Sequence, residues 1–136
     1  MQGEAGRIEV IVGPMFAGKS TEMLRRLDRA ELARKRVVAI KYHKDRRYSD
    51  GSVVVTHDMK QRIAISSATL MPHLGTCLKY DYIGIDEGQF YPDIVEFCET
   101  LANSGKVVIV AALDGDFMRR PLGRVLELMS KCETIE

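Results

Sequence analysis

The sequence predicts a single α/β domain with a mostly parallel central sheet flanked by helices. Short apolar runs alternate along the chain with segments of helical periodicity, which is the pattern of successive βαβ units. The first apolar run leads directly into a glycine-containing loop and then into a helical segment. The 136 residues are enough for one domain with one hydrophobic core.

The first three elements follow from residues 8–42. Residues 8–12 form an apolar run that ends at Gly13, so they predict a buried strand. Residues 19–34 contain no glycine or proline and predict a helix. Its expected apolar face consists of Met23, Leu24, Leu27, Ala30 and Ala33. Residues 37–42, with the sequence VVAIKY, predict the second strand.

The middle of the chain is less regular. Asp50-Gly51 precedes the run SVVVT, and this pattern predicts the tip of a hairpin. Residues 66–78 predict a short helix that is broken near Pro72. Residues 80–86, with the sequence YDYIGID, predict a further strand.

Three elements complete the prediction. Residues 92–104 predict a helix, because Pro92 suits a first turn and Gly105 suits a helix end. Residues 106–113, with the sequence KVVIVAAL, predict the most buried strand. Residues 122–129 predict a last helix. In a parallel sheet of this kind, sites form at the carboxyl ends of the strands.

The composition limits the possible partners. Hydrophobic residues make up 46% and charged residues 29%, as in an ordinary soluble globular protein. The net charge of +1 gives no reason to expect nucleic-acid or membrane binding. The longest apolar run is too short to span a bilayer. The three cysteines show no Cys-x-x-Cys spacing, so they predict reduced thiols in a cytoplasmic protein.

The segment GPMFAGKS matches the phosphate-binding pattern G-x-x-x-x-G-K-[ST] at every fixed position. Glycines let backbone N–H groups surround phosphate oxygens, and the following helix adds its positive N-terminus. Lys19 would reach the β- and γ-phosphates, and the Ser20 hydroxyl would ligate Mg²⁺. The expected nucleotide-binding residues here are Gly13, Pro14, Met15, Phe16, Ala17, Gly18, Lys19 and Ser20. A chance match is the alternative, but the position between a strand and a helix favours a P-loop NTPase (RecA-like) domain.

Two carboxylates, Asp86 and Glu87, follow the strand predicted over residues 80–86. An aspartate at such a strand end holds Mg²⁺ in P-loop proteins. Neighbouring side chains at a strand end face opposite ways, so we expect Glu87 to point differently and to accept a proton from a nucleophile. The alternative is a pair that merely begins a solvated loop. The nucleophile stays open at this point: a sugar hydroxyl would make a kinase, and water would make an ATPase with a helicase-like DExx motif.

Five segments together resemble the cytosolic-type (type II) thymidine kinases over residues 7–121. They are GPMFAGKST, IKYHKDRRYS, THD, IDEGQFYPDIVEFCE and VVIVAALDGDF. The resemblance implies transfer of the γ-phosphoryl group of Mg-ATP to the 5′-hydroxyl of thymidine, and also of deoxyuridine, in nucleoside salvage for DNA synthesis. It also implies a homotetramer in the cytoplasm that binds neither nucleic acid nor membrane.

The resemblance assigns roles to residues of this chain. It implies that Glu87 is the general base and that Lys19 and Arg47 neutralise phosphate charge, while Ser20 and Asp86 hold magnesium. The further implied nucleotide-site residues are Asp45, Arg46, Arg47, Asp86, Glu87, Gly88 and Gln89. The implied nucleoside pocket consists of Met15, Phe90, Leu113 and Phe117.

The chain departs from the family pattern in three ways. In the family a small zinc-binding module with a lasso-like loop follows this region, and its ligands are not in this chain, so we expect residues 1–136 to be a fragment of a kinase domain. Leu122 and Tyr91 stand where the family often has phenylalanine. Two alternatives therefore stay open beside the kinase: a nucleic-acid-stimulated ATPase, and a fragment that only binds nucleotide or assembles with copies of itself.

Overall fold

The computed structural model describes residues 5–13, 18–42, 53–55, 61–113, 124–131 and 134–135. The strands are β1 (Arg7–Gly13), β2 (Val37–Tyr42), β3 (Val53–Val55), β4 (Gln61–Ser67), β5 (Tyr82–Ile85), β6 (Val107–Leu113) and β7 (Thr134–Ile135). The helices are α1 (Lys19–Leu32), α2 (Leu74–Cys77), α3 (Ile94–Asn103) and α4 (Val125–Met129), with 3₁₀ turns η1 (Met71–His73) and η2 (Gly88–Phe90).

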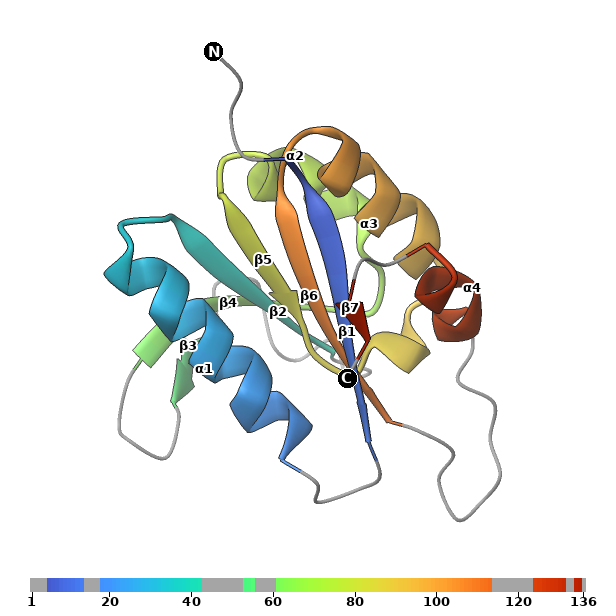
Figure 1. The fold of residues 1–136 in the computed structure, drawn as a ribbon, viewed down its shortest axis with the longest axis horizontal. Coiled ribbons are helices and arrows are strands. Elements are labelled where there is room, and N and C mark those ends of the chain that lie inside the picture. The colour runs from blue at the N-terminus through green and yellow to red at the C-terminus, as the bar shows by residue number, and fades with distance from the viewer. Residues whose placement is uncertain are drawn as a thin grey trace.

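The strands form one sheet in the order β3-β4-β2-β5-β6-β1-β7 (Figure 1). Every described pair is parallel except β3 with β4, which is antiparallel. The predicted mostly parallel α/β fold is therefore confirmed. The register places Gly13 beside Leu113, and Ile40 beside Ile85. The carboxyl ends of four parallel strands therefore lie side by side, and the candidate site is located there. These strands are β1, β6, β5 and β2.

Helices cover both faces of the sheet. Helix α1 packs on β5 and β6, whereas α3 packs on β1 and β6 from the other side and carries α4 beside it (Figure 1). Successive side chains of β1 point to opposite faces of the sheet and so contribute to both cores. Val10 packs in the core under α3 and α4, and Ile11 packs in the core under α1. The α3 side holds the larger cluster of buried side chains.

The strongest sequence patterns predicted their elements to within a few residues. The strands at residues 8–12, 37–42 and 106–113 and the helix at 19–34 are confirmed. The predicted apolar face of α1 is confirmed for Met23, Leu27 and Ala30, which are buried, but Ala33 lies beyond the helix and is exposed. Three elements are shorter than predicted, since β5 begins at Tyr82, α3 at Ile94 and α4 at Val125.

Two strands were not predicted, and one helix was partly wrong. Residues 66 and 67 belong to strand β4, which pairs with β3 as the second arm of a hairpin. Pro72 begins a helical segment instead of breaking one, because it lies in η1 and α2 follows directly. The short edge strand β7 was also missed. The predicted hairpin tip at Asp50-Gly51 lies outside the described residues.

The part of the chain that the structure describes contains no helix with both the length and the apolar character needed to cross a membrane.

Candidate active site

The phosphate-loop residues that the structure describes have the predicted context. Gly13 ends β1, Gly18 precedes α1, and Lys19 is the first residue of that helix. Gly18 has φ 77° and ψ 20°, a left-handed conformation that favours glycine. The N-cap residue Gly18 has no side chain that could accept a hydrogen bond from the first N–H groups of α1, and such a helix start suits an anion. The strand–loop–helix context of the motif is therefore confirmed.

The two predicted magnesium ligands lie in direct contact. Ser20 is in the first turn of α1 and Asp86 follows β5, and the Ser20 hydroxyl donates to Asp86 Oδ1 at 2.8 Å. The Asp86 N–H donates to the carbonyl oxygen of Ile40 in β2 at 2.9 Å, which fixes the start of the loop after β5. The sheet thus brings together a hydroxyl and a carboxylate that are 66 residues apart in sequence.

This pair suits magnesium. Mg²⁺ prefers oxygen ligands and binds through one or two protein groups, with water and substrate phosphates completing its shell. Ser20 Oγ and Asp86 Oδ1 supply such oxygens next to the N-terminus of α1. Elsewhere, the described segments contain no group of three or more His, Cys, Asp or Glu residues that could hold a metal ion.

Glu87 adopts a left-handed backbone conformation, with φ 56° and ψ 46°. The predicted reason for its direction was therefore wrong: Glu87 lies beyond β5, so strand alternation does not orient it. Its N–H donates to Asp86 Oδ1 at 3.0 Å, which helps to hold this conformation. Left-handed non-glycine residues cost about 1–3 kcal/mol and cluster at functional sites.

Gly88 packs closely against strand β6. A Cβ atom on Gly88 would lie 2.5 Å from Cγ1 of Val110 in β6, so a side chain does not fit without displacement. The turn η2 is thereby pressed against β6. The sequence predicted Gly88 as a nucleotide-site residue, and the structure shows a packing reason for glycine at this position.

Gln89 contacts the predicted general base. Its Nε2 donates to Glu87 Oε2 at 3.2 Å. This hydrogen bond orients the Glu87 carboxylate. Gln89 and Glu87, both predicted as nucleotide-site residues, are therefore joined by a hydrogen bond.

An aromatic cluster lies beside the acidic pair. Phe90 remains 42% exposed, and its ring centroid lies 4.8 Å from that of Tyr42. Tyr91 is buried and meets Tyr42 edge-on at 5.4 Å. Exposure of Phe90 agrees with a role as a wall for a flat ligand. Tyr42 was not predicted as a site residue, although its place at the carboxyl end of β2, next to β5, is a usable signal.

The remaining predicted residues are only partly visible. The backbone of Leu113 ends β6 beside Gly13, and its predicted role in the nucleoside pocket stays a prediction. The other predicted site residues lie outside the described residues: Pro14, Met15, Phe16, Ala17, Asp45, Arg46, Arg47 and Phe117. Their roles stay predictions.

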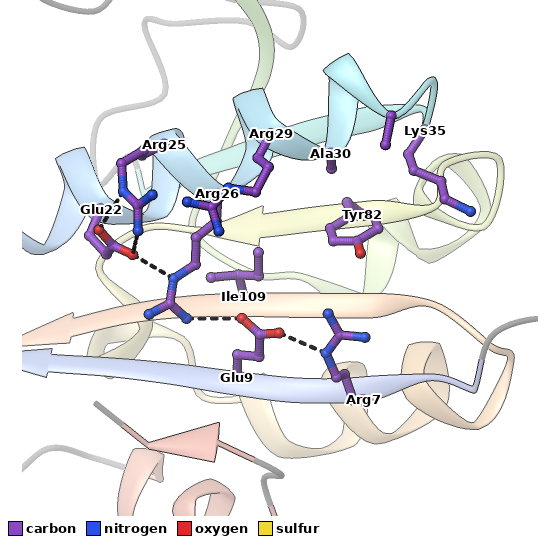
Figure 2. Close-up of a pocket in the computed structure, with 11 residues that line it drawn as sticks. Arg7, Glu9, Glu22, Arg25, Arg26, Arg29, Ala30, Lys35, Tyr82 and Ile109 are labelled. Carbon is purple, nitrogen blue, oxygen red and sulfur yellow. Dashed lines mark hydrogen bonds and ion pairs between the residues drawn. The ribbon is translucent and has the colours of Figure 1, made fainter.

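A groove of about 510 Å³ lies away from this site, between α1 and the amino-terminal parts of β1, β5 and β6 (Figure 2). Charged side chains cross it in series. Arg26 donates to Glu22 at 2.7 Å and to Glu9 at 2.9 Å, and Arg7 donates to Glu9 at 2.7 Å. Hydrogen bonds from Arg25 and Arg26 lower the pKa of Glu22 to about 2. This network ties α1 to β1 and contains none of the residues near Asp86.

Comparisons with known proteins identify the relatives of this chain. A family model described as "Thymidine kinase" matches residues 6–136. The chain is 52% identical over 134 residues to thymidine kinase 1 of Dictyostelium discoideum, covering 96% of this chain and 59% of that protein. It is 50% identical over 130 residues to the monkeypox virus thymidine kinase, covering 96% of this chain and 72% of that protein. It is 52% identical over 130 residues to the human cytosolic thymidine kinase, covering 96% of this chain and 55% of that protein.

The chain therefore spans between about half and three-quarters of the length of these relatives. The family match covers nearly the whole chain. The chain belongs to the thymidine kinase family.

Proposed function

We propose that this protein transfers the γ-phosphoryl group of Mg-ATP to the 5′-hydroxyl of thymidine, and also of deoxyuridine. The observation that carries the proposal is the contact of Ser20 with Asp86, directly beside Glu87. It supports a site in which a phosphate-binding helix start, two magnesium ligands and a potential base share one edge of the sheet.

The chain's own residues would act mainly by positioning and charge neutralisation, because phosphoryl transfer needs little covalent help from the protein. The N–H groups at the start of α1 would receive phosphate oxygens, and Lys19 would neutralise the β- and γ-phosphates. Ser20 and Asp86 would hold Mg²⁺, which neutralises charge on the transferred group when bound. Arg47 is proposed as a second cation on the strength of the family resemblance.

Glu87 is proposed as the general base. Its carboxylate would accept the proton of the 5′-hydroxyl as that oxygen attacks the γ-phosphorus, and Gln89 would hold the carboxylate in the required orientation. Phe90 and Tyr42 would form a wall for the nucleoside, together with the predicted residues Met15, Leu113 and Phe117. A nucleic-acid-stimulated ATPase is not favoured, because the family match is to thymidine kinases.

The variant Glu87→Gln tests the base. It keeps the size of the side chain and removes its ability to accept a proton, so we expect turnover to fall by at least ~10²-fold with ATP affinity retained. The matched control is Glu127→Gln, which changes an exposed carboxylate on α4. Turnover of Glu87→Gln close to that of the control would contradict the assignment.

Assembly and location belong to the same proposal. The resemblance supports a cytoplasmic homotetramer, and one relative carries "cytosolic" in its name. Sedimentation velocity would test the assembly, with about four times the monomer mass of 15.3 kDa expected and a monomer contradicting it. Zinc, which the resemblance implies for full-length relatives, is not assigned to the described residues.

A further inference from the structure

We propose that Asp93 is a positioning residue that fixes the far end of the acidic loop, defined here as residues 86–93. The loop begins at Asp86, carries Glu87 and ends immediately before α3. The consequence for catalysis rests on the proposed function, because it requires Glu87 to be the base. The structural part of the proposal, that Asp93 holds the loop, does not depend on the substrate.

The Asp93 carboxylate reaches across the fold to backbone N–H groups. Leu70 N–H donates to its two oxygens at 3.0 and 3.2 Å, and Met71 N–H donates to Oδ2 at 2.8 Å. These donors follow β4 and lie at the start of η1, more than 20 residues away in sequence. Hydrogen bonds from N–H groups to a carboxylate are among the stronger ones in proteins.

Asp93 makes this contact in place of a local one. It occupies the N-cap position of α3, where an aspartate side chain usually accepts an N–H of its own helix. No such side-chain hydrogen bond is present at α3. The carboxylate is instead committed to Leu70 and Met71, and so it joins the acidic loop to the segment that follows β4.

Removing the carboxylate would leave a donor without its partner. Leu70 is fully buried, so its N–H cannot turn to bulk water. A buried N–H group that loses its acceptor costs about 1–3 kcal/mol. The segment at Leu70 and the end of the acidic loop would therefore separate or rearrange when Asp93 is truncated.

The loop is short enough to transmit this change to Glu87. Its first end is fixed by the Asp86 N–H on Ile40 and by Ser20 on Asp86. Between its ends, Phe90 N–H donates to the Glu87 carbonyl at 3.1 Å, and Tyr91 N–H donates to the Gly88 carbonyl at 3.3 Å. These bonds make the middle of the loop a single turn, so its orientation depends on both ends.

A second contact lies at the same end of the loop. Arg124 Nη1 donates to the Pro92 carbonyl at 3.3 Å, but Arg124 also pairs with Glu96 and Glu127 on the protein surface. Exposed pairs of this kind contribute little to stability. Asp93 is therefore the stronger candidate for the anchor.

The test compares Asp93→Ala with Asp81→Ala. The Asp81 carboxylate accepts a hydrogen bond from the Arg36 N–H at 2.8 Å, and the two residues are 45 apart in sequence. It is therefore a similar link from a carboxylate to the backbone. Asp81 lies just before β5, at the amino-terminal ends of the strands and away from the acidic loop. We expect amide hydrogen exchange at Phe90 and Tyr91 to accelerate at least ~10-fold more in Asp93→Ala than in Asp81→Ala, since only the former releases the loop. Equal acceleration in both variants would overturn the proposal, as would none in either.

A conservative variant keeps the test decisive if Asp93→Ala folds poorly. Asp93→Asn retains one acceptor oxygen but loses the negative charge that strengthens its hydrogen bonds, so we expect exchange at Phe90 and Tyr91 to be faster than in the wild type. Exchange in Asp93→Asn indistinguishable from the wild type, with the Leu70 and Met71 amides also unchanged, would overturn the role of the carboxylate charge in the anchor.

Measurement of turnover tests the catalytic part of the proposal. We expect kcat for nucleoside phosphorylation to fall in Asp93→Ala while KM for ATP stays within about twofold, because the phosphate loop is untouched. A loosened loop with unchanged kcat would overturn the positioning role. If the wild-type chain phosphorylates no nucleoside, the proposed function fails, and the exchange comparison still decides whether Asp93 holds the loop.

Discussion

Asp86 and Glu87 are neighbours in sequence, yet their environments prepare them for different tasks. Asp86 Oδ1 accepts hydrogen bonds from the Ser20 hydroxyl and the Glu87 N–H, so it is held at the start of α1. Glu87 has a left-handed backbone conformation, and its carboxylate accepts a hydrogen bond from the Gln89 side chain. The Asp86 carboxylate is therefore suited to bind a metal ion, and the Glu87 carboxylate is suited to accept a proton.

Tyr91 gives a residue-scale prediction. Burial, together with the nearby charge of Asp86, raises the pKa of Tyr91, so its hydroxyl stays protonated. Among the described residues this hydroxyl has no hydrogen-bond partner. We expect Tyr91→Phe to raise the free energy of unfolding by about 1 kcal/mol, because an unsatisfied buried polar group is removed.

Chemical denaturation measures this change, and Tyr82→Phe is the control. The Tyr82 side chain is only partly buried and raises the pKa of Arg7, so loss of its hydroxyl should leave stability unchanged or lower. A loss of stability in Tyr91→Phe would show instead that its hydroxyl has a partner in solution.

Residue roles could be predicted where a motif determined both the type of side chain and its position in the fold. The pairing of Ser20 with Asp86 follows from the phosphate loop and from the strand before Asp86. The contact from Asp93 to Leu70 could not be predicted, because a local N-cap was the simpler expectation and the position of the segment after β4 was unknown. Tyr42 differs, because its place at the carboxyl end of a strand was a usable signal, although its contacts with Phe90 and Tyr91 come from a distant part of the chain.

At the scale of elements, the packing of η2 on β6 positions the acidic loop. Gly88→Ala would place a Cβ 2.5 Å from Val110, so we expect a loss of about 1–3 kcal/mol in the free energy of unfolding. Turnover should fall as well, since the displaced turn carries Glu87. The control is Gly75→Ala in α2, where an added Cβ would meet no described atom within 4 Å apart from its chain neighbours and the backbone of its own helix. It should be neutral or stabilising by up to about 1 kcal/mol.

Thermal unfolding of the two glycine variants decides the point. Equal stability of Gly88→Ala and the wild type would mean that the turn does not press against β6 as the structure shows.

The attachment of α1 to the sheet gives a pH prediction. Hydrogen bonds from Arg25 and Arg26 lower the pKa of Glu22 from an ordinary 4.5 to about 2. A carboxylate whose pKa is lower in the folded state adds stability above its unfolded pKa and loses it as the pH falls through the folded value. The contribution of Glu22 should therefore be complete above about pH 4.5 and vanish near pH 2.

Glu22→Gln should accordingly be less stable than the wild type at pH 7, and the difference should shrink between about pH 4.5 and 2. The free energy of unfolding measured against pH shows this directly. The control is Glu99→Gln, whose carboxylate is exposed and lies 3.8 Å from Lys131. A difference for Glu22→Gln that is constant with pH would contradict the role of its ion pairs.

Elements were predictable in proportion to how strongly their pattern repeats. The long helix α1 and the apolar strand β6 have unambiguous periodicity. The strand β4 has the mixed sequence QRIAISS, and β7 has two residues, so neither exceeds the background of loop sequence. Both owe their existence to pairing with neighbouring strands, which local sequence does not reveal.

At the scale of the whole molecule, the parallel sheet is what assembles the site. Parallel pairing of β1, β6, β5 and β2 aligns their carboxyl ends, and buried cores on both faces hold them in register. Gly13 at the start of the phosphate loop, the acidic loop and Tyr42 all lie at the carboxyl ends of these strands for this reason. The fold class was predictable because it depends only on the alternation of strands and helices.

The most direct test of the central claim is the identity of the phosphoryl acceptor. The protein would be incubated with Mg-ATP with and without thymidine, with ADP formation followed and thymidine monophosphate detected by mass. The site predicts that ADP and thymidine monophosphate form together and only when thymidine is present. ADP formation that is independent of thymidine, with no phosphorylated nucleoside, would contradict the kinase assignment and identify water as the acceptor.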